Sequence, residues 1–175
     1  MRGPLSLLIL FPYTDLMIDV KDIQSALEEY LSERDDLYIV AVDVRAGNLI
    51  SITIDSDYDS ISLDTITALS HYIEERFDRD VEDYELTVTS AGLTSPLRLP
   101  RQYRKYIGEP IIATLRSGGI EKGTLVAADE GGFEMEVIRM EKREGDKRRK
   151  GYPTPLLLTY DEVITSSYVR RSGVG

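Results

Sequence analysis

The chain has 175 residues, of which 21 are Lys or Arg, 31 are Asp or Glu and one is His, so its formal net charge is −10. This length allows one or two domains, and 42% apolar residues exclude a globally disordered chain. The lack of Cys excludes disulfides, Fe–S clusters, thiolate metal sites and cysteine nucleophiles, and a single His excludes sites built from several imidazoles. We therefore expect neither a metal nor another cofactor.

The charge is unevenly divided along the chain. Residues 1–97 contain 6 basic and 20 acidic residues, whereas residues 98–175 contain 15 basic and 11 acidic residues. The net charges are therefore −14 and +4. This asymmetry favours a basic protein as the partner of the first part and phosphate groups as partners of the second, although ordinary solubility explains it equally well.

The first residues include an apolar run from Leu5 to Phe11. The run is far shorter than the roughly 20 apolar residues of a membrane-spanning helix, and residues 12–14 (Pro-Tyr-Thr) do not form the small-residue cleavage site of a signal peptide. We therefore expect a cytoplasmic protein without a membrane contact. Residues 1–18 are interpreted as an N-terminal extension, and Met17 is a candidate start of translation.

Residues 19–97 have the pattern of a small, acidic α/β domain. Asp19 and Ser62 are favoured helix N-caps, and apolar residues follow each of them at spacings of three and four. The segment from Leu49 to Asp55 alternates Ile with Ser or Thr, as a half-buried strand does. We expect a helix, two strands, a second helix and a third strand at residues 20–34, 37–45, 49–55, 63–77 and 84–89. This α-β-β-α-β order predicts a three-stranded sheet with both helices on one face.

Residues 98–175 show a different pattern, in which short apolar runs are separated by Gly-containing turns. We expect a short basic helix or turn at residues 101–106 and strands at 111–116, 124–128, 133–140, 155–160 and 165–170. Short strands with no room for a long helix favour a small β-barrel, so the predicted fold class is α+β with two domains. The segment from Lys142 to Lys150 (KREGDKRRK) is interpreted as a solvated loop between strands.

One segment resembles a metal-binding loop. Asp55, Asp57 and Asp59 are spaced as positions 1, 3 and 5 of an EF-hand. The rest of that loop is missing, because Ser60 stands where a Gly is needed and Ile66 stands where the bidentate Glu is needed. We interpret the segment as a polar connection from strand to helix, with weak cation binding as the alternative.

No catalytic pattern is evident. His71 is the one candidate imidazole base, and it lies about 200° around the second helix from the apolar stripe, so we expect it to face solvent or a domain boundary. Gly118 to Thr124 has Lys before Gly, unlike a Walker phosphate-binding loop, and predicts a hairpin turn. We therefore predict a protein that is not an enzyme, with no small-molecule substrate.

Two groups of basic residues are candidate contacts for nucleic acid. The first has spacings of three and four and consists of Arg98, Arg101, Arg104 and Lys105. The second is the densest positive run and consists of Lys147, Arg148, Arg149 and Lys150. On a helix, the first group forms a cationic edge beside Tyr103 and Tyr106 that suits phosphate or base contacts; alternatively, the tyrosines pack onto the barrel and the charges face water. The second group suits phosphate contacts that do not read sequence.

The junction between the two expected domains, residues 84–110, reads YELTVTSAGLTSPLRLPRQYRKYIGEP. It resembles the signature of the ribosome maturation factor family, RimP, in which a strand runs into a Ser-Ser-Pro-Gly-Leu-Asp-Arg-Pro-Leu loop followed by a short helix. The positions that match are Ser90, Gly92, Leu93, Pro96, Leu97, Tyr106 and Gly108. Ala91, Thr94 and Ser95 stand where the family has Pro, Asp and Arg, so no role of that Asp–Arg pair is carried over.

The junction can also be interpreted from its residues alone. Gly92 is expected to take a backbone conformation that other residues resist, and Pro96 and Pro100 fix φ and stiffen the connection. Leu93 and Leu97 are expected to pack between the domains. We therefore interpret the junction as a stiff, packed spacer, with a partner-contacting loop as the alternative.

The resemblance extends over residues 18–170 and implies an N-terminal α/β domain joined to a C-terminal SH3-like or Sm-like β-barrel. It also implies a non-enzymatic factor for maturation of the small (30S) ribosomal subunit. On this basis we expect the acidic domain to contact a basic ribosomal protein, and the basic residues to contact rRNA, on the free subunit. A monomer is the default expectation. The alternative is a free-standing RNA-binding or regulatory module whose acidic domain recruits a protein.

Overall fold

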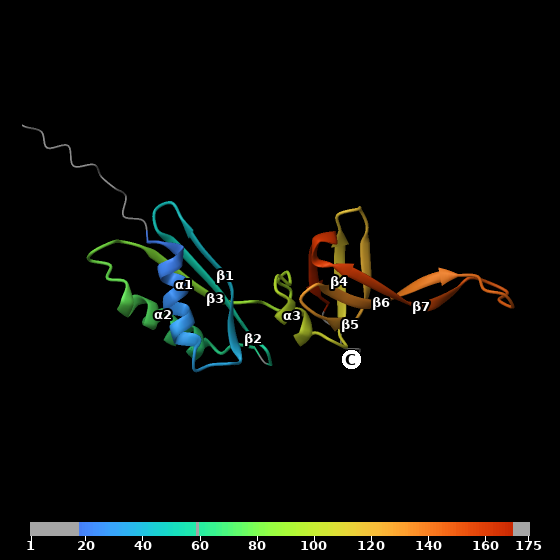
Figure 1. The fold of residues 1–175 in the computed structure, drawn as a ribbon, viewed down its shortest axis with the longest axis horizontal. Helices are drawn as coiled ribbons and strands as arrows, with labels where there is room; N and C mark the ends of the chain where they lie inside the picture. Colours follow the sequence, from blue (N-terminus) through green and yellow to red (C-terminus); the bar gives the residue numbers. More distant parts are fainter. Residues whose placement is uncertain (1–17, 59, 170–175) are drawn as a thin grey trace, which may run out of the picture.

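The computed structural model describes residues 18–58 and 60–169, which form two sheets from consecutive stretches of chain. The first sheet and its helices comprise α1 (Val20–Leu31), β1 (Leu37–Arg45), β2 (Leu49–Ser56), α2 (Leu63–Arg76) and β3 (Glu85–Ser90). The second sheet and its connections comprise α3 (Pro100–Lys105), β4 (Pro110–Leu115), β5 (Ile120–Ala128), β6 (Gly132–Glu141), β7 (Lys150–Thr159), the 3-10 turn η1 (Tyr160–Glu162) and β8 (Val163–Tyr168). We call residues 18–90 the N-terminal part and residues 96–169 the C-terminal part; Figure 1 shows them at opposite ends of an elongated molecule.

The predicted order of elements in the N-terminal part is confirmed. The side chain of Asp19 accepts a hydrogen bond from the amide of Lys21 (2.9 Å), and the hydroxyl of Ser62 accepts one from the amide of Thr65 (3.1 Å), so both expected caps are present. Strand β2 is central, antiparallel to β1 and parallel to β3. Helix α1 ends at Leu31 rather than near residue 34, because the Ser32 hydroxyl donates to the Glu29 carbonyl and closes the last turn.

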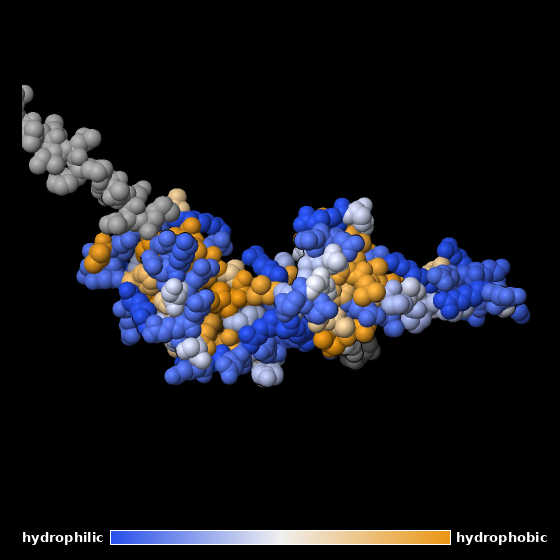
Figure 2. Space-filling view, in the orientation of Figure 1, coloured by the Kyte–Doolittle hydropathy of each residue, from blue (hydrophilic) through white to orange (hydrophobic). Residues whose placement is uncertain are grey.

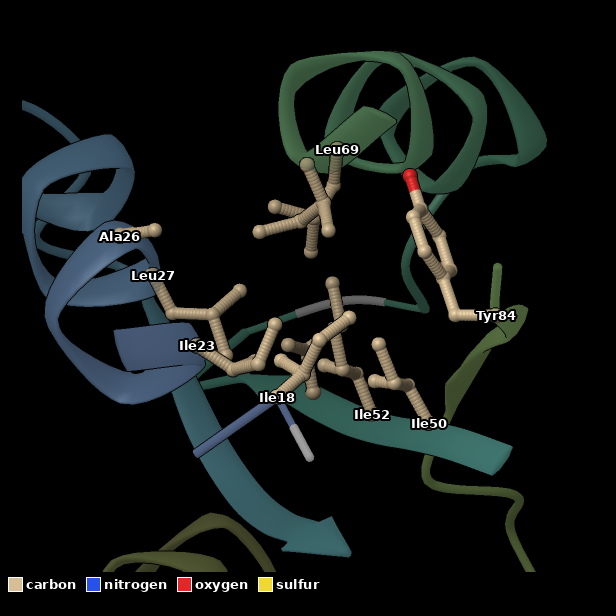
Figure 3. Packing of buried hydrophobic residues seen from close by; sticks show 10 residues of the cluster. Ile18, Ile23, Ala26, Leu27, Ile50, Ile52, Leu69 and Tyr84 are labelled. Atoms are coloured by element: carbon tan, nitrogen blue, oxygen red, sulfur yellow. The ribbon is translucent and has the colours of Figure 1, made fainter. Parts of the chain in front are cut away.

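The core of the N-terminal part explains why both helices lie on one face of the sheet. Ile50, Ile52 and Ile54 alternate along β2 and are buried on the same face. Figure 3 shows Ile23 and Leu27 of α1, with Leu69 of α2, directed toward Ile50 and Ile52 of β2. The predicted arrangement of three strands with two helices on one face is therefore confirmed.

The C-terminal part contains the five predicted strands, all antiparallel, in the order β7-β6-β5-β4-β8. One hydrophobic cluster takes buried residues from every one of these strands and from α3. The prediction of a small β-barrel is confirmed as far as a five-stranded antiparallel sheet around one core; in the described chain, β7 and β8 do not pair with each other, so the sheet is not seen to close.

The segment predicted as a solvated loop connects β6 to β7 and is largely exposed over residues 142–149, so that prediction is confirmed except for its last residue. Strand β7 begins at Lys150, which pairs with Glu141 of β6, so the two strands form a long hairpin. Pro153 and Pro155 lie within β7, where they are tolerated because β7 is an edge strand and their missing amides lose no partner. We call residues 138–153 the hairpin arm; Figure 1 shows it extending away from the N-terminal part.

Two further expectations concern the ends and the hairpin turn. Residues 1–17, with the candidate start Met17 and most of the expected extension, lie outside the described residues. The predicted turn after β4 is present, with Gly118 and Gly119 immediately before β5. None of the helices in the described stretches is long and apolar enough to cross a membrane.

Candidate functional site

Helix α3 lies within the junction, on the side of the C-terminal part that faces the N-terminal part (Figure 1). Pro100 occupies its first position, where a missing amide costs nothing. The side-chain oxygen of the buried Gln102 accepts hydrogen bonds from the amides of Arg98 (2.8 Å) and Leu99 (3.2 Å), which have no partner within the helix. The predicted basic helix is therefore confirmed, and Gln102 stabilises its beginning.

Arg101 extends from α3 to the N-terminal part. Its guanidinium donates to both carboxylate oxygens of Asp57, at 2.7 and 2.5 Å, and also to the carbonyl of Asp35. The same group lies over the Tyr38 ring, 4.4 Å from its centroid. A bidentate pair of this kind fixes the orientation of the arginine as well as its position.

Lys105 and Gln102 bind a second, more buried carboxylate. Asp55 accepts hydrogen bonds from the Lys105 ammonium and from the Gln102 amide, both at 3.0 Å, and from the amide of Ser56 at 2.8 Å. The side chain of Asp55 is 6% exposed and that of Lys105 is 13% exposed. We call the set Asp55, Asp57, Arg101, Gln102 and Lys105 the α3–β2 contact.

The α3–β2 contact changes the acidity of its members. The hydrogen bond from Arg101 holds the pKa of Asp57 below its usual value. Burial, with the nearby charges of Asp55 and Asp57, raises the pKa of the Tyr38 phenol well above its usual value. Asp57 is therefore a carboxylate and Tyr38 a neutral phenol at neutral pH.

The α3–β2 contact alters the expected cationic edge. Arg101 and Lys105 contact carboxylates of the N-terminal part and do not form one solvent-facing edge with Arg98 and Arg104. Arg104 is exposed and pairs with Glu130. Arg98 is exposed, and no carboxylate of the described residues forms an ion pair with it.

The two tyrosines of this helix pack inward, as the alternative interpretation predicted. Tyr103 is buried in the C-terminal core, and its hydroxyl is hydrogen-bonded to Ser166. Tyr106 stacks on Tyr168 with ring centroids 4.9 Å apart. Neither ring is therefore arranged with the arginines as a stacking surface for bases.

The structure agrees only in part with the expectations for the junction residues. Gly92 does not have a positive φ, so the expected special backbone conformation is wrong; its amide donates to the Ser95 hydroxyl at 3.0 Å. Leu93 is 55% exposed, so it does not pack between the two parts. Leu97 is buried, but in the C-terminal core.

The remaining junction residues attach the chain to strand edges. Ser90 is the last residue of β3, and Pro96 bridges to Ser167 of β8. The amide of Leu97 donates to the carbonyl of Ser166 (2.8 Å), so this short segment covers part of the β8 edge. Gly108 has a φ of 89° and donates to the Leu125 carbonyl at 2.8 Å, which fixes the chain where it enters β4.

The second basic group lies at the end of the hairpin arm and is ordered by Asp146. This carboxylate accepts hydrogen bonds from Lys150 (2.7 Å), from the Tyr152 hydroxyl and from the amide of Arg143 (3.2 Å), and these bonds lower its pKa. The Arg143 guanidinium lies 3.7 Å from the centroid of the Tyr152 ring.

All four cations of this group are exposed, and two of them are bound by other residues of the arm. Arg149 donates to the Met140 carbonyl at 2.8 Å, and Lys150 is bound to Asp146. Lys147 and Arg148 are exposed, and within residues 18–58 and 60–169 no carboxylate pairs with either. The arm therefore presents these two cations from an ordered turn.

The other chemical candidates have structural partners. Asp55 and Asp57 bind side chains of α3, and Asp59 lies outside the described residues. In the part of the chain that the structure describes, no three His, Asp or Glu side chains are grouped as a metal site. His71 is exposed, with its Nδ1 3.6 Å from a Glu74 carboxylate oxygen, as expected for a residue facing solvent.

Comparison with known proteins identifies the chain. The RimP N-terminal domain family matches residues 26–94. A ribosome maturation factor RimP from Porphyromonas gingivalis is 40% identical over 134 residues, covering 77% of this chain and 87% of that protein. The chain belongs to the RimP family. RimP proteins from Flavobacterium psychrophilum (31% identity, 75% of this chain and 82% of the relative) and Christiangramia forsetii (28% identity, 81% and 92%) are also similar over most of their length.

The α3–β2 contact in this RimP-family chain was not predicted, although its parts were visible. Asp55 and Asp57 were interpreted as part of a loop and α3 as a cationic edge. The two carboxylates nevertheless meet residues of α3 that lie 44 to 50 positions later in the chain. A pair of acids at a strand end and cations on a later short helix was the available signal. Tyr38 and Gln102 carried no signal that distinguishes them from ordinary core residues.

Proposed function

We propose that this protein is a maturation factor for the small (30S) ribosomal subunit that acts by binding rather than by catalysis. The observation that carries the proposal is its match to proteins named ribosome maturation factor RimP over 87% of the length of one of them. The proposal includes a cytoplasmic, monomeric factor without cofactor or small-molecule substrate, which binds the free subunit.

The proposal includes two domains, residues 19–97 and 98–175, the second of which is an SH3-like β-barrel. Two separate hydrophobic clusters, one for each part, support this division. Five antiparallel strands around one cluster, with a 3-10 turn before the last strand, support the barrel assignment.

The two domains have different partners in this proposal. The acidic first domain, in a stretch with a net charge of −14, contacts a basic ribosomal protein, and the exposed cations Arg98, Lys147 and Arg148 of the second domain contact rRNA. The α3–β2 contact links the domains, so binding at one surface raises the effective concentration of the other at its partner.

Salt dependence of subunit binding tests the rRNA contact. The double variant Lys147→Ala/Arg148→Ala should bind isolated small subunits more weakly, and the slope of log affinity against log salt should fall by roughly one per lost phosphate contact. The matched control Lys21→Ala/Arg45→Ala removes two exposed cations of the N-terminal part and should leave the slope unchanged. Equal slopes for wild type and the tip variant would refute the rRNA contact of Lys147 and Arg148.

A further inference from the structure

The hairpin arm has an exposed apolar face. Ile138 and Met140 alternate along β6 and lie opposite Pro153 and Gly151 of β7, so their side chains share one face. Ile138 is 60% exposed and Met140 is 54% exposed. Along β7 the face continues with Pro155 and the exposed Leu157, but their partners on β6 are Glu136 and Glu134, so the wholly apolar part of the face ends at Ile138 and Pro153.

Gly151 allows this face to form. A Cβ atom at this position would lie 2.6 Å from Cγ2 of Ile138, which is closer than any side chain tolerates. The bare backbone of Gly151 therefore leaves room for the Ile138 side chain, and Ile138, Met140 and Pro153 form one apolar surface at this part of the arm.

The opposite face of the arm is polar. Arg139 points away from the apolar face and forms an ion pair with Glu121 of β5 at 2.8 Å. Its neighbour across the ladder is Tyr152, whose hydroxyl is bound to Asp146. The arm is therefore amphipathic, and Lys147 and Arg148 lie at its end. Figure 2 shows hydrophilic surface at the far end of the arm and a hydrophobic area on the C-terminal part near its base.

These features fit RNA with unpaired bases. Exposed phosphates are attracted to the two tip cations, whereas the adjoining apolar face needs a partner that is itself poorly hydrated. Ile, Met, Leu and Pro are side chains that nucleic-acid-binding proteins press against unstacked bases. The major groove of an RNA duplex is too deep and narrow for a two-stranded ribbon, so a continuous duplex fits the arm poorly.

We infer that the hairpin arm binds RNA at a segment with unpaired bases, which its apolar face covers while Lys147 and Arg148 hold the adjoining phosphates. The inference deepens the proposed function and rests on it, because the rRNA of the small subunit is the RNA that such a factor meets. Cations alone bind the phosphates of any RNA, so in this inference the apolar face gives the arm its preference for unpaired bases.

The test uses the full-length chain and two labelled RNAs, a short continuous duplex and the same duplex interrupted by an internal loop of unpaired bases. Binding is followed by fluorescence anisotropy at several salt concentrations. The face variant is Ile138→Ser/Met140→Ser, and its matched control is Leu63→Ser/Val81→Ser, which changes two apolar residues of the N-terminal part that are even more exposed. Thermal unfolding of all variants verifies that each is folded.

Wild type should bind the looped RNA about tenfold more tightly than the duplex, because burial of one or two exposed apolar side chains against unpaired bases is worth about that much. The face variant should lose this preference and keep its salt slope, whereas the control should keep both. Equal binding of the two RNAs by wild type, or an unchanged preference in the face variant, would overturn the inference. So would a face variant that binds RNA normally but no longer binds isolated small subunits, since that result assigns the face to a protein. A retained loop preference without binding to small subunits would instead overturn the proposed function.

Discussion

Asp55 and Asp57 lie two positions apart at the end of β2 but have different surroundings. Asp55 is buried and accepts three hydrogen bonds, one of them from the partly buried ammonium of Lys105. Asp57 is partly exposed and binds one guanidinium through both oxygens. Loss of its partner should therefore lower the free energy of unfolding strongly at Asp55, because an uncompensated charge is left in the interior. At Asp57, the loss of free energy of unfolding should depend on pH.

Replacement of Lys105 tests the buried pair. Lys105→Met keeps most of the side-chain volume and should lower the free energy of unfolding by about 3 kcal/mol, because Asp55 loses its counter-charge. The double variant Asp55→Asn/Lys105→Met should be more stable than Lys105→Met alone. Urea unfolding measures both, and a double variant whose losses simply add would show that the two groups do not interact.

Acid unfolding tests the pair of Asp57 and Arg101. The pKa of Asp57 is lowered in the folded chain, so its contribution to stability is complete above the ordinary value of about 3.9 and disappears as the pH falls through the lowered value. The stability difference between wild type and Asp57→Asn should therefore be constant near neutral pH and shrink below about pH 4. A difference that stays constant down to the acid unfolding transition would contradict this assignment.

Helix α3 is six residues long and depends on both polar atoms of the Gln102 side chain. The Gln102 oxygen accepts amide hydrogen bonds at the helix start, and its nitrogen donates to Asp55. Gln102→Glu keeps the acceptors but places a second carboxylate beside Asp55, and it should destabilise the fold by roughly 3 kcal/mol. Gln102→Met, which loses the hydrogen bonds without adding a charge, is the control. If Gln102→Glu were as stable as Gln102→Met, the result would contradict the geometry of the α3–β2 contact.

The glycines before and after α3 differ in their backbone. Gly108 has a φ of 89°, whereas Gly92 lies outside the left-handed region and an added Cβ would lie 3.2 Å from the Ser95 hydroxyl oxygen. Gly108→Ala should lower the free energy of unfolding by about 1 kcal/mol more than Gly92→Ala does. Thermal unfolding of the two variants measures this order, and a larger loss at Gly92 would restore the interpretation that the sequence suggested.

The elements were predictable where local patterns determine them. Asp19 and Ser62, followed by apolar residues at spacings of three and four, are sufficient for both helices, and alternation is sufficient for β2. The length of β7 was not predictable in this way, because Pro153 and Pro155 interrupt the pattern and are tolerated only on an edge strand.

The α3–β2 contact was unpredictable for a related reason. A basic residue at helical spacing has the same sequence signal whether it faces solvent or a carboxylate of another part of the chain. The contact between Arg101 and Asp57 depends on how the two sheets lie relative to each other, which no local pattern specifies. The tip cations Lys147 and Arg148 were predictable as candidates, because they lie in a run that has few acids.

At the scale of the whole molecule, two surfaces of opposite charge lie far apart. The acidic N-terminal part and the basic tip of the hairpin arm are at opposite ends of the elongated chain (Figure 1), and α3 connects them through the α3–β2 contact. A partner that presents both basic protein and RNA phosphates would engage both ends. An assembling ribosomal subunit has this composition.

Co-sedimentation of the full-length protein with isolated small subunits, with assembled ribosomes and with free rRNA, each across a salt series, tests the central claim most directly. A maturation factor of the free subunit should sediment with isolated small subunits, lose affinity as the salt concentration rises, and bind assembled ribosomes and free rRNA more weakly. Equal binding to free rRNA and to subunits, or no binding to subunits, would contradict the account.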